Sequence, residues 1–178
     1  MSEEAQLAVV TEIAPTDFDS VYRRYSGNVA TIGLRILGRP SEIDDFVQDV
    51  FVEVHLGLDR VREPRAIRSW VNRLAVRIAV RKLRRRRVLR LVGLEQDVSY
   101  LDIADPGASP EQRALLSATF RVLDEVPAQA RVAWILRHLE GRTLPDVAET
   151  TGRSLASVKR DISKAQSLLD RRLADDRP

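Results

Sequence analysis

The helical spacing of apolar positions is clearest in the segment 143–169, which predicts two helices joined by a short turn. Thr143 and Asp146 have the spacing of a capping box, in which two side chains satisfy free amides at a helix start. Gly152 supplies the turn because glycine readily adopts positive φ, and Ser154 caps the second helix. The turn is too short to let the helices separate, which is typical of a helix-turn-helix.

The second of these helices has one apolar stripe and an opposite face of hydroxyl and basic side chains. Short hydroxyls and long cations near a helix start suit a DNA major groove. A hairpin of two helices with a solvated basic face fits the same pattern equally well, so the segment alone leaves both interpretations open. The stripe comprises Val158, Ile162, Ala165 and Leu169, and the opposite face carries Ser157, Lys159, Arg160 and Lys164.

Three amphipathic helices are predicted upstream of this segment. The first begins at a cap-like pair, Thr16 and Asp19, ends before Gly38 and Pro40, and is expected to be interrupted near Gly27. Its inward positions are Phe18, Val21, Tyr22, Tyr25, Val29, Ile32 and Ile36.

The second helix begins at Ser41 and Asp44, which are expected to cap it, and ends at about Leu58. One of its faces is apolar and the other is acidic. An acidic surface is repelled by phosphate and prefers a basic protein partner. The inward positions are Ile43, Phe46, Val47, Val50, Phe51 and Val54, and the outward ones are Asp45, Gln48, Asp49 and Glu53.

The third helix follows a loop at Pro64 and covers roughly residues 65–91. Trp70, Leu74 and Ile78 are expected to face the core, although Trp70 could instead stack on an unpaired base. Basic side chains extend from its middle to its end and could follow a nucleic-acid backbone, while simple solvation of a charged helix end is the alternative. The exposed strip comprises Asn72, Arg73, Arg77, Arg81 and Arg84, and the basic run continues through Arg85, Arg86, Arg87 and Arg90.

Between residues 92 and 110 the helical spacing fails, and Gly, Pro, Ser and Asp predominate, which is typical of a linker. A second helical module begins near Glu111, and its first two helices end at Pro127 and Gly141. The predicted fold class is therefore all-α, with two small helical domains joined by a flexible linker. The expected boundaries are 1–15 for a disordered tail, 16–91 and 111–173 for the two domains, and 92–110 for the linker.

Composition agrees with this class: the 178 residues are 44% hydrophobic and 31% charged, with only eight Gly and eight Pro. No apolar run could span a bilayer and the N-terminus lacks a basic start, so we expect a cytoplasmic protein without membrane insertion. There is no cysteine, and His55 and His138 are the only histidines, which argues against a metal site or a cofactor. No nucleophile beside a base and no phosphate loop is evident, so catalysis is not expected.

The formal net charge of +3 conceals an uneven distribution. Acidic residues gather in the segment 44–53, whereas the segment 81–90 is basic without one acidic residue. The basic segment would release counterions from phosphate, and the acidic one would not. Two kinds of partner are therefore predicted, a nucleic acid and a protein.

Three segments in this order resemble the two-domain bacterial sigma factors of the extracytoplasmic-function (ECF) type, from about Phe18 to Leu173. The segment 44–51, DDFVQDVF, resembles the family's helix for docking on core RNA polymerase. The segment 69–75, SWVNRLA, resembles its promoter-melting segment. The segment 136–165 resembles its C-terminal helix-turn-helix, in the positions Leu136, Arg137, His138, Leu139, Glu140, Gly141, Leu144, Val147, Ala148, Gly152, Val158, Lys159, Ser163, Lys164 and Ala165.

This resemblance implies a sigma factor that binds core RNA polymerase and directs promoter-specific transcription initiation. Its N-terminal domain would bind polymerase and open the downstream promoter element, and its helix-turn-helix would read the upstream element. An anti-sigma factor is also implied as a partner. The implied sites are Asp45, Gln48, Asp49, Phe51 and Glu53 for polymerase; Trp70, Asn72, Arg73, Arg77, Arg81 and Arg84 for the downstream element; and, within the helix-turn-helix 142–161 and just beyond it, Ser154, Ser157, Lys159, Arg160 and Lys164 for the upstream element.

Four positions depart from the family pattern. Arg77 stands where the melting helix often has Asn, and Asp161 stands where the recognition helix often has Arg or another polar DNA contact. A carboxylate is repelled by phosphate but can accept from cytosine N4, so Asp161 either faces away from DNA or alters base preference. Pro145 and Arg153 are also unusual for the family.

Two other functions fit parts of the chain. A free-standing dimeric helix-turn-helix regulator would bind an operator without polymerase, but it gives the acidic helix no role. A protein-interaction adaptor would leave the basic strip as a solvated face and predicts no salt-dependent binding to DNA.

Overall fold

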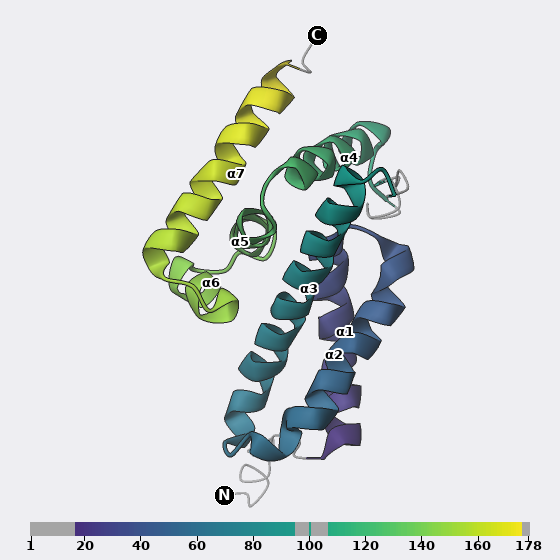
Figure 1. Cartoon of the computed structure of the whole chain (residues 1–178), viewed down its shortest axis with the longest axis vertical. Helices are drawn as coiled ribbons and strands as arrows, with labels where there is room; N and C mark the ends of the chain where they lie inside the picture. Colours follow the sequence, from purple (N-terminus) through teal and green to yellow (C-terminus); the bar gives the residue numbers. More distant parts are fainter. Residues whose placement is uncertain (1–16, 95–99, 101–106, 176–178) are drawn as a thin grey trace, which may run out of the picture.

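The computed structural model describes residues 17–94, 100 and 107–175, and every regular element within them is a helix. Figure 1 shows α1, α2 and α3 side by side, with the C-terminal helices packed along one side of α3. The predicted all-α class is therefore confirmed. The helices are α1 (Phe18–Leu37), α2 (Ile43–Gly57), α3 (Ile67–Leu91), α4 (Pro110–Glu125), α5 (Ala128–His138), α6 (Leu144–Thr151) and α7 (Leu155–Asp175), with 3₁₀ turns η2 (Pro40–Glu42), η3 (Leu58–Arg60) and η4 (Pro64–Ala66).

Helix α1 is unbroken through Gly27, so the interruption predicted there is wrong. A glycine inside a helix costs only about 1 kcal/mol relative to alanine, and burial of Tyr25 and Val29 on either side of Gly27 outweighs this cost. The cap also differs from the prediction. Asp17, rather than Thr16 with Asp19, precedes the helix and accepts from the Ser20 amide at 2.9 Å, and Thr16 lies outside the described residues.

The start of α2 is organised by backbone rather than by side chains. Pro40 opens the turn η2, and the amide of Ile43 donates to the Pro40 carbonyl. Glu42 precedes the helix without a side-chain cap, so the caps predicted at Ser41 and Asp44 are wrong. The turn supplies the first hydrogen bond that a capping side chain would otherwise provide.

The core of the N-terminal helices lies where α1, α2 and α3 meet, and Phe46 of α2 fills its centre without exposed surface. The ring lies against the backbone of α1, since a Cβ on Gly33 would lie 2.4 Å from it. Gly33 therefore allows the two helices to approach closely around a large side chain.

Helix α3 is buried on two sides. As predicted, Leu74 and Ile78 are buried and Trp70 is partly buried against the core, and Ala75 is buried beside them. Val76 and Val80 are buried as well, although they lie outside the predicted stripe, because α5 and α6 pack against α3 opposite α1 and α2. A helix that supports two layers needs apolar residues around most of its circumference.

The C-terminal helices pack around α5, which Figure 1 shows almost end-on between α7 and α3. Its residues Ala130, Val132, Ala133, Ile135 and Leu136 are all within 1% of complete burial. Val147 and Leu169 close the same core from α6 and α7, in agreement with the predicted stripes. The buried apolar residues of both halves form one continuous cluster, so the two predicted domains are in contact rather than apart.

Candidate nucleic-acid and protein interfaces

The outer face of α2 is acidic at its start and apolar at its end. Asp45, Gln48 and Asp49 are exposed, as predicted, and they are followed on the same face by Val52 and Leu56, which are 52% and 70% exposed. Exposed large apolar side chains beside carboxylates are typical of a protein-binding surface rather than of solvated helix. The two apolar residues were not predicted, because neither continues the inward stripe from which the helix was recognised.

A groove of about 950 Å³ lies between this face and α1. Phe51 lies at its base, with its ring centroid 4.7 Å from that of Tyr22 and 6.3 Å from that of Phe18. Gln48 and Leu56 border the groove from α2. The acidic face thus continues into an apolar depression that could receive the apolar side of a partner helix.

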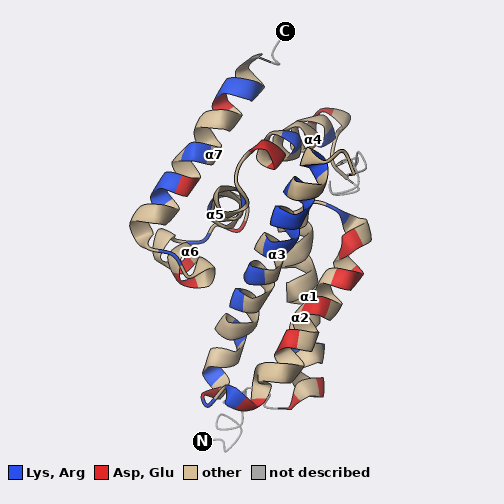
Figure 2. Ribbon diagram, viewed as in Figure 1, with Lys and Arg blue, Asp and Glu red and all other residues tan. Residues whose placement is uncertain are grey.

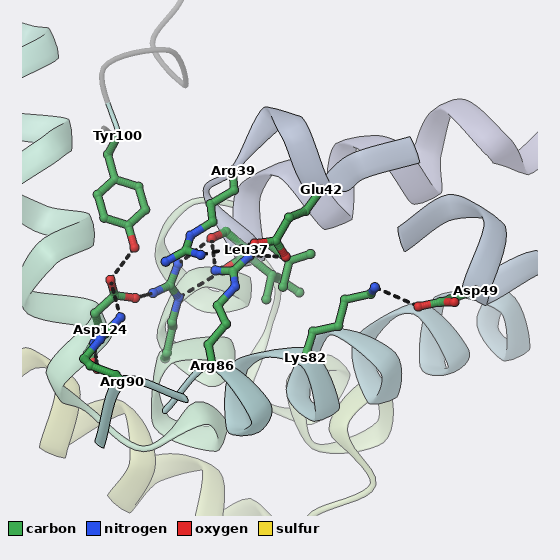
Figure 3. A network of polar contacts seen from close by, with 11 residues as sticks. Leu37, Arg39, Glu42, Asp49, Lys82, Arg86, Arg90, Tyr100 and Asp124 are labelled. Carbon is green, nitrogen blue, oxygen red and sulfur yellow. Dashed lines mark hydrogen bonds and ion pairs between the residues drawn. The ribbon is translucent and has the colours of Figure 1, made fainter. Parts of the chain in front are cut away.

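Basic residues follow α3, and acidic residues follow the neighbouring helix α2 (Figure 2). Some of the basic side chains of α3 form ion pairs with acidic side chains of α2. Arg77 and Arg81 lie 2.9 and 3.6 Å from the carboxylate of Glu53, and Lys82 lies 2.7 Å from that of Asp49 (Figure 3). The paired arginines remain 62% exposed, so the pairs are solvent-screened and weak.

A cleft of about 610 Å³ separates the basic strip on α3 from the end of α6 and the turn between α6 and α7. Trp70, Arg73 and Arg84 line it from α3, and Thr150 and Gly152 line it from α6 and the turn after it. At one edge the cleft is bridged, because Arg73 lies 3.1 Å from Glu149 of α6.

The segment 143–169 folds as two helices, α6 and α7, joined by a tight turn. Thr143 and Asp146 form the predicted capping box, and Gly152 ends α6 at φ +64°. The Ser154 hydroxyl accepts from the Ser157 amide at 3.2 Å at the start of α7. Each of these local predictions is confirmed, because capping depends on near neighbours alone.

The exposed face of α7 carries the basic side chains predicted for it. Lys159, Arg160 and Lys164 are exposed, and Ser154 is exposed at the helix start. Ser157 is half-buried and accepts from the Arg160 guanidinium at 3.4 Å. Hydroxyl and cationic groups thus share one face, the composition expected of a helix that enters a DNA groove.

Comparison with known proteins identifies the two halves. The model for sigma-70 region 2 matches residues 21–88, and the model for sigma-70 region 4 matches residues 117–167. The ferric citrate uptake sigma factor FecI of Escherichia coli is 31% identical over 161 residues, which cover 87% of this chain and 90% of FecI. This chain is an ECF RNA polymerase sigma factor.

Two further comparisons describe how far the likeness extends. The ECF RNA polymerase sigma factor SigE of Mycolicibacterium smegmatis is 25% identical over 162 residues, which cover 89% of this chain and 62% of SigE. The sigma factor RpoE of Bartonella quintana, solved in complex with the anti-sigma factor NepR, has the same fold, with a TM-score of 0.65 at 19% identity, and the match covers 92% of this chain and all of RpoE. The ECF sigma factor described here is a transcription initiation factor with region 2 and region 4.

Two site residues of this sigma factor, Asn72 and Glu53, lie elsewhere than predicted, whereas Phe51 is buried as its inward position in α2 predicts. Asn72 is 6% exposed and accepts from the Asn28 side-chain amide at 2.8 Å, so it faces α1 instead of the exposed strip. Phe51 is 4% exposed and forms part of the groove base, and Glu53 is half-buried against the arginines of α3. Helical spacing alone does not show that a polar side chain such as Asn72 pairs with a polar side chain of a neighbouring helix.

The carboxylate of Asp161 faces the turn of the helix-turn-helix. It lies 3.0 Å from Nε of Arg153, and only 19% of its side chain is exposed. Arg153 and Asp161, two of the four positions that depart from the family pattern, thus form an ion pair with each other. Of the alternatives left open by the sequence, the structure favours the one in which Asp161 points away from the row formed by Lys159 and Arg160.

Two other types of site are not found among the residues described. Within them, no helix is long and apolar enough to span a bilayer. Nor do histidine, aspartate and glutamate side chains gather there in a group that could hold a metal ion.

Replacing Thr143 by alanine is expected to destabilise region 4 by about 1 kcal/mol, because the capping box would lose its acceptor for the Asp146 amide. The same Thr143 hydroxyl contacts the Asp146 carboxylate at 2.6 Å and, with the Thr143 amide, holds the pKa of that carboxyl below its usual value. Thermal unfolding followed by circular dichroism would measure the loss. The control is Thr150→Ala near the end of α6, which is expected to leave the stability almost unchanged.

Proposed function

We propose that the exposed face of α2 in region 2 binds core RNA polymerase and that α7 of region 4 reads the upstream promoter element. What supports this division is the separation of one acidic, partly apolar surface from one basic surface on a single chain that belongs to the sigma factors. The polymerase surface is Asp45, Gln48 and Asp49 with Val52 and Leu56. The acidic residues would attract a basic partner, and the apolar ones would anchor it.

For the downstream element, we propose contacts from the cleft side of α3. Trp70, Arg73, Arg77, Arg81 and Arg84 carry the charge and the aromatic surface that an opened strand requires. Asn72 is omitted because it is buried against α1. Region 2 then covers 16–91 and region 4 covers 111–173, with 92–110 as the linker between them.

The protein acts as an initiation factor and catalyses no step itself. It would work in the cytoplasm, where the bacterial chromosome and polymerase are found. Because RpoE of Bartonella quintana was solved with the anti-sigma factor NepR, we also expect an anti-sigma factor to control this chain. The groove between α1 and α2 is where an amphipathic helix of such a partner would dock, in competition with polymerase.

Run-off transcription with bacterial core polymerase tests the function directly. Purified protein would be added to core enzyme on a pool of promoters that includes the DNA upstream of its own gene. Promoter-specific transcripts that require the protein are the expected result. Failure to bind core polymerase, together with a dimer on DNA in gel shifts, would instead support the free-standing regulator.

Replacing Lys159 by alanine is expected to weaken binding to the upstream element by about 1–3 kcal/mol if the ammonium reads a base. Competition binding of holoenzyme to the promoter and to point-mutated promoters would measure this. An equal loss on every sequence, with a smaller salt dependence, would make Lys159 a phosphate contact. Arg172→Ala is the control, because Arg172 is an exposed cation near the other end of α7 and pairs with Glu125.

A further inference from the structure

The turn of the helix-turn-helix carries a charged side chain whose backbone is fixed on both sides. Arg153 lies between Gly152, which ends α6 at φ +64°, and Ser154, which caps α7. The Arg153 amide donates to the Ala148 carbonyl at 3.0 Å, so the turn closes on the end of α6. The guanidinium of Arg153 therefore extends from a fixed point directly before α7.

Asp161 of α7 holds this guanidinium in place. Its carboxylate lies 3.0 Å from Nε of Arg153, and the side chains of Asp161 and Arg153 are 19% and 35% exposed. The facing atoms, Nε and Oδ2, are buried, and neither forms a hydrogen bond with another group in the described part of the chain. The Arg77–Glu53 pair of region 2 is more exposed, at 62% and 34%. The pair in region 4 is therefore better shielded from solvent, and each charge compensates the other.

Asp161 is the one acidic residue of the sequence between positions 155 and 169. The basic residues of the same segment, Lys159, Arg160 and Lys164, are exposed. A carboxylate that faced phosphate beside them would lower the attraction of α7 for any duplex. The ion pair turns the carboxylate toward the turn instead, so its charge acts on Arg153.

The place of Arg153 in the motif determines what its guanidinium would contact if it were released. In a helix-turn-helix the second helix enters the major groove while the first crosses the DNA backbone, so the turn between them lies beside phosphates. A guanidinium binds phosphate well because its donors lie in one plane and can form two parallel hydrogen bonds. A free arginine at this turn would therefore add a contact that carries no sequence information.

We propose that Asp161 is a positioning residue that withholds Arg153 from DNA phosphate and thereby limits the sequence-independent part of DNA binding by region 4. A cation that stays paired within the protein neutralises no phosphate, so it adds nothing to the counterion release that favours binding to every sequence. The contacts then come from the exposed face of α7, which carries Lys159 and Arg160. This role of Asp161 rests on the function proposed above, because it requires α7 to enter the major groove.

Binding of holoenzyme to promoter DNA at two salt concentrations tests this role. Asp161→Asn removes the charge of the carboxylate and keeps its shape, so the guanidinium of Arg153 is no longer compensated. One additional phosphate contact steepens the dependence of log K on log salt by about 0.9. The ratio of the affinity at about 50 mM salt to that at about 200 mM salt should therefore exceed the parent's ratio about 3.5-fold. The increase should be equal on a promoter with an intact upstream element and on one with that element scrambled.

Two further variants separate the release of Arg153 from the loss of a negative charge. Arg153→Gln combined with Asp161→Asn removes both members of the pair and should restore the salt dependence of the parent. Asp170→Asn removes the same charge from an exposed position about 14 Å farther along α7, where it should change the salt dependence little. Thermal unfolding would show that each variant is folded, and the double variant still tests the role if Asp161→Asn alone does not fold.

An unchanged salt dependence in Asp161→Asn, or an equal increase in Asp170→Asn, would overturn the role of Asp161. A double variant whose salt dependence is about 0.9 shallower than the parent's would overturn it as well, because Arg153 would then contact phosphate already in the parent. An increase confined to the intact upstream element would make Arg153 a base contact and would also contradict the proposal.

Lys159→Ala distinguishes failure of this role from failure of the proposed function. If Asp161→Asn has no effect while Lys159→Ala weakens binding, the role of Asp161 is wrong and the function of α7 stands. If neither substitution changes binding to the promoter, both proposals are wrong.

Discussion

Replacing Phe46 by alanine is expected to lower the free energy of unfolding by about 3–5 kcal/mol. The ring has no exposed surface and lies at the centre of the region 2 core, where the backbone of α1 at Gly33 leaves no room for relaxation. A cavity would remain in place of the ring, because packed helices collapse only partly into such a space. Urea denaturation followed by circular dichroism would measure the change.

Two companion variants make this result specific. Gln48→Ala, on the exposed face of the same helix, should shift stability by less than about 0.5 kcal/mol. Gly33→Ala should be strongly destabilising alone, since its Cβ would lie 2.4 Å from the Phe46 ring, and much less so in combination with Phe46→Ala. Additive effects would show that the ring does not set the distance between α1 and α2.

Replacing Asp45 and Asp49 together by lysine is expected to weaken binding to core polymerase at least about 100-fold, while the fold remains intact. Both carboxylates are exposed, and the change turns attraction for a basic partner into repulsion. Co-purification with core enzyme and run-off transcription would measure the loss.

The two substitutions should not contribute equally. Asp49 is already paired with Lys82 at 2.7 Å, so part of its charge is compensated within the protein, and Asp45→Lys alone is expected to cause most of the loss. Asp59→Lys in η3 is the matched control, because it reverses an exposed carboxylate outside the proposed surface. Normal co-purification of the double variant would contradict the assignment of this face.

Features set by near neighbours in the chain could be predicted from the sequence. The capping box at Thr143, the turn at Gly152 and the apolar stripe of α7 each depend on residues within a few positions. The outward face of α2 was predicted for the same reason. The resemblance to ECF sigma factors then assigned the outward face of α2 to polymerase and the exposed face of α7 to DNA.

Features that depend on contact between the two halves could not be predicted. Arg131 lies in an ordinary apolar helix pattern, and nothing near it in the sequence indicates that it reaches the carbonyls of α1. Tyr100 lies in a segment whose composition indicates a linker, yet its ring is buried. Asn72 was expected to be exposed, and only its distance of 2.8 Å to Asn28 of α1 reveals the side that it faces.

The pairing of α2 with α3 links two surfaces that serve different partners. Glu53 compensates Arg77 and Arg81, so the carboxylate that limits the positive potential of one surface belongs to the helix that carries the other. A substitution selected for tighter polymerase binding at this point would also change how strongly the protein attracts phosphate. Since these pairs are screened by solvent, each substitution would change the potential only slightly, but a change at position 53 would act on both surfaces at once.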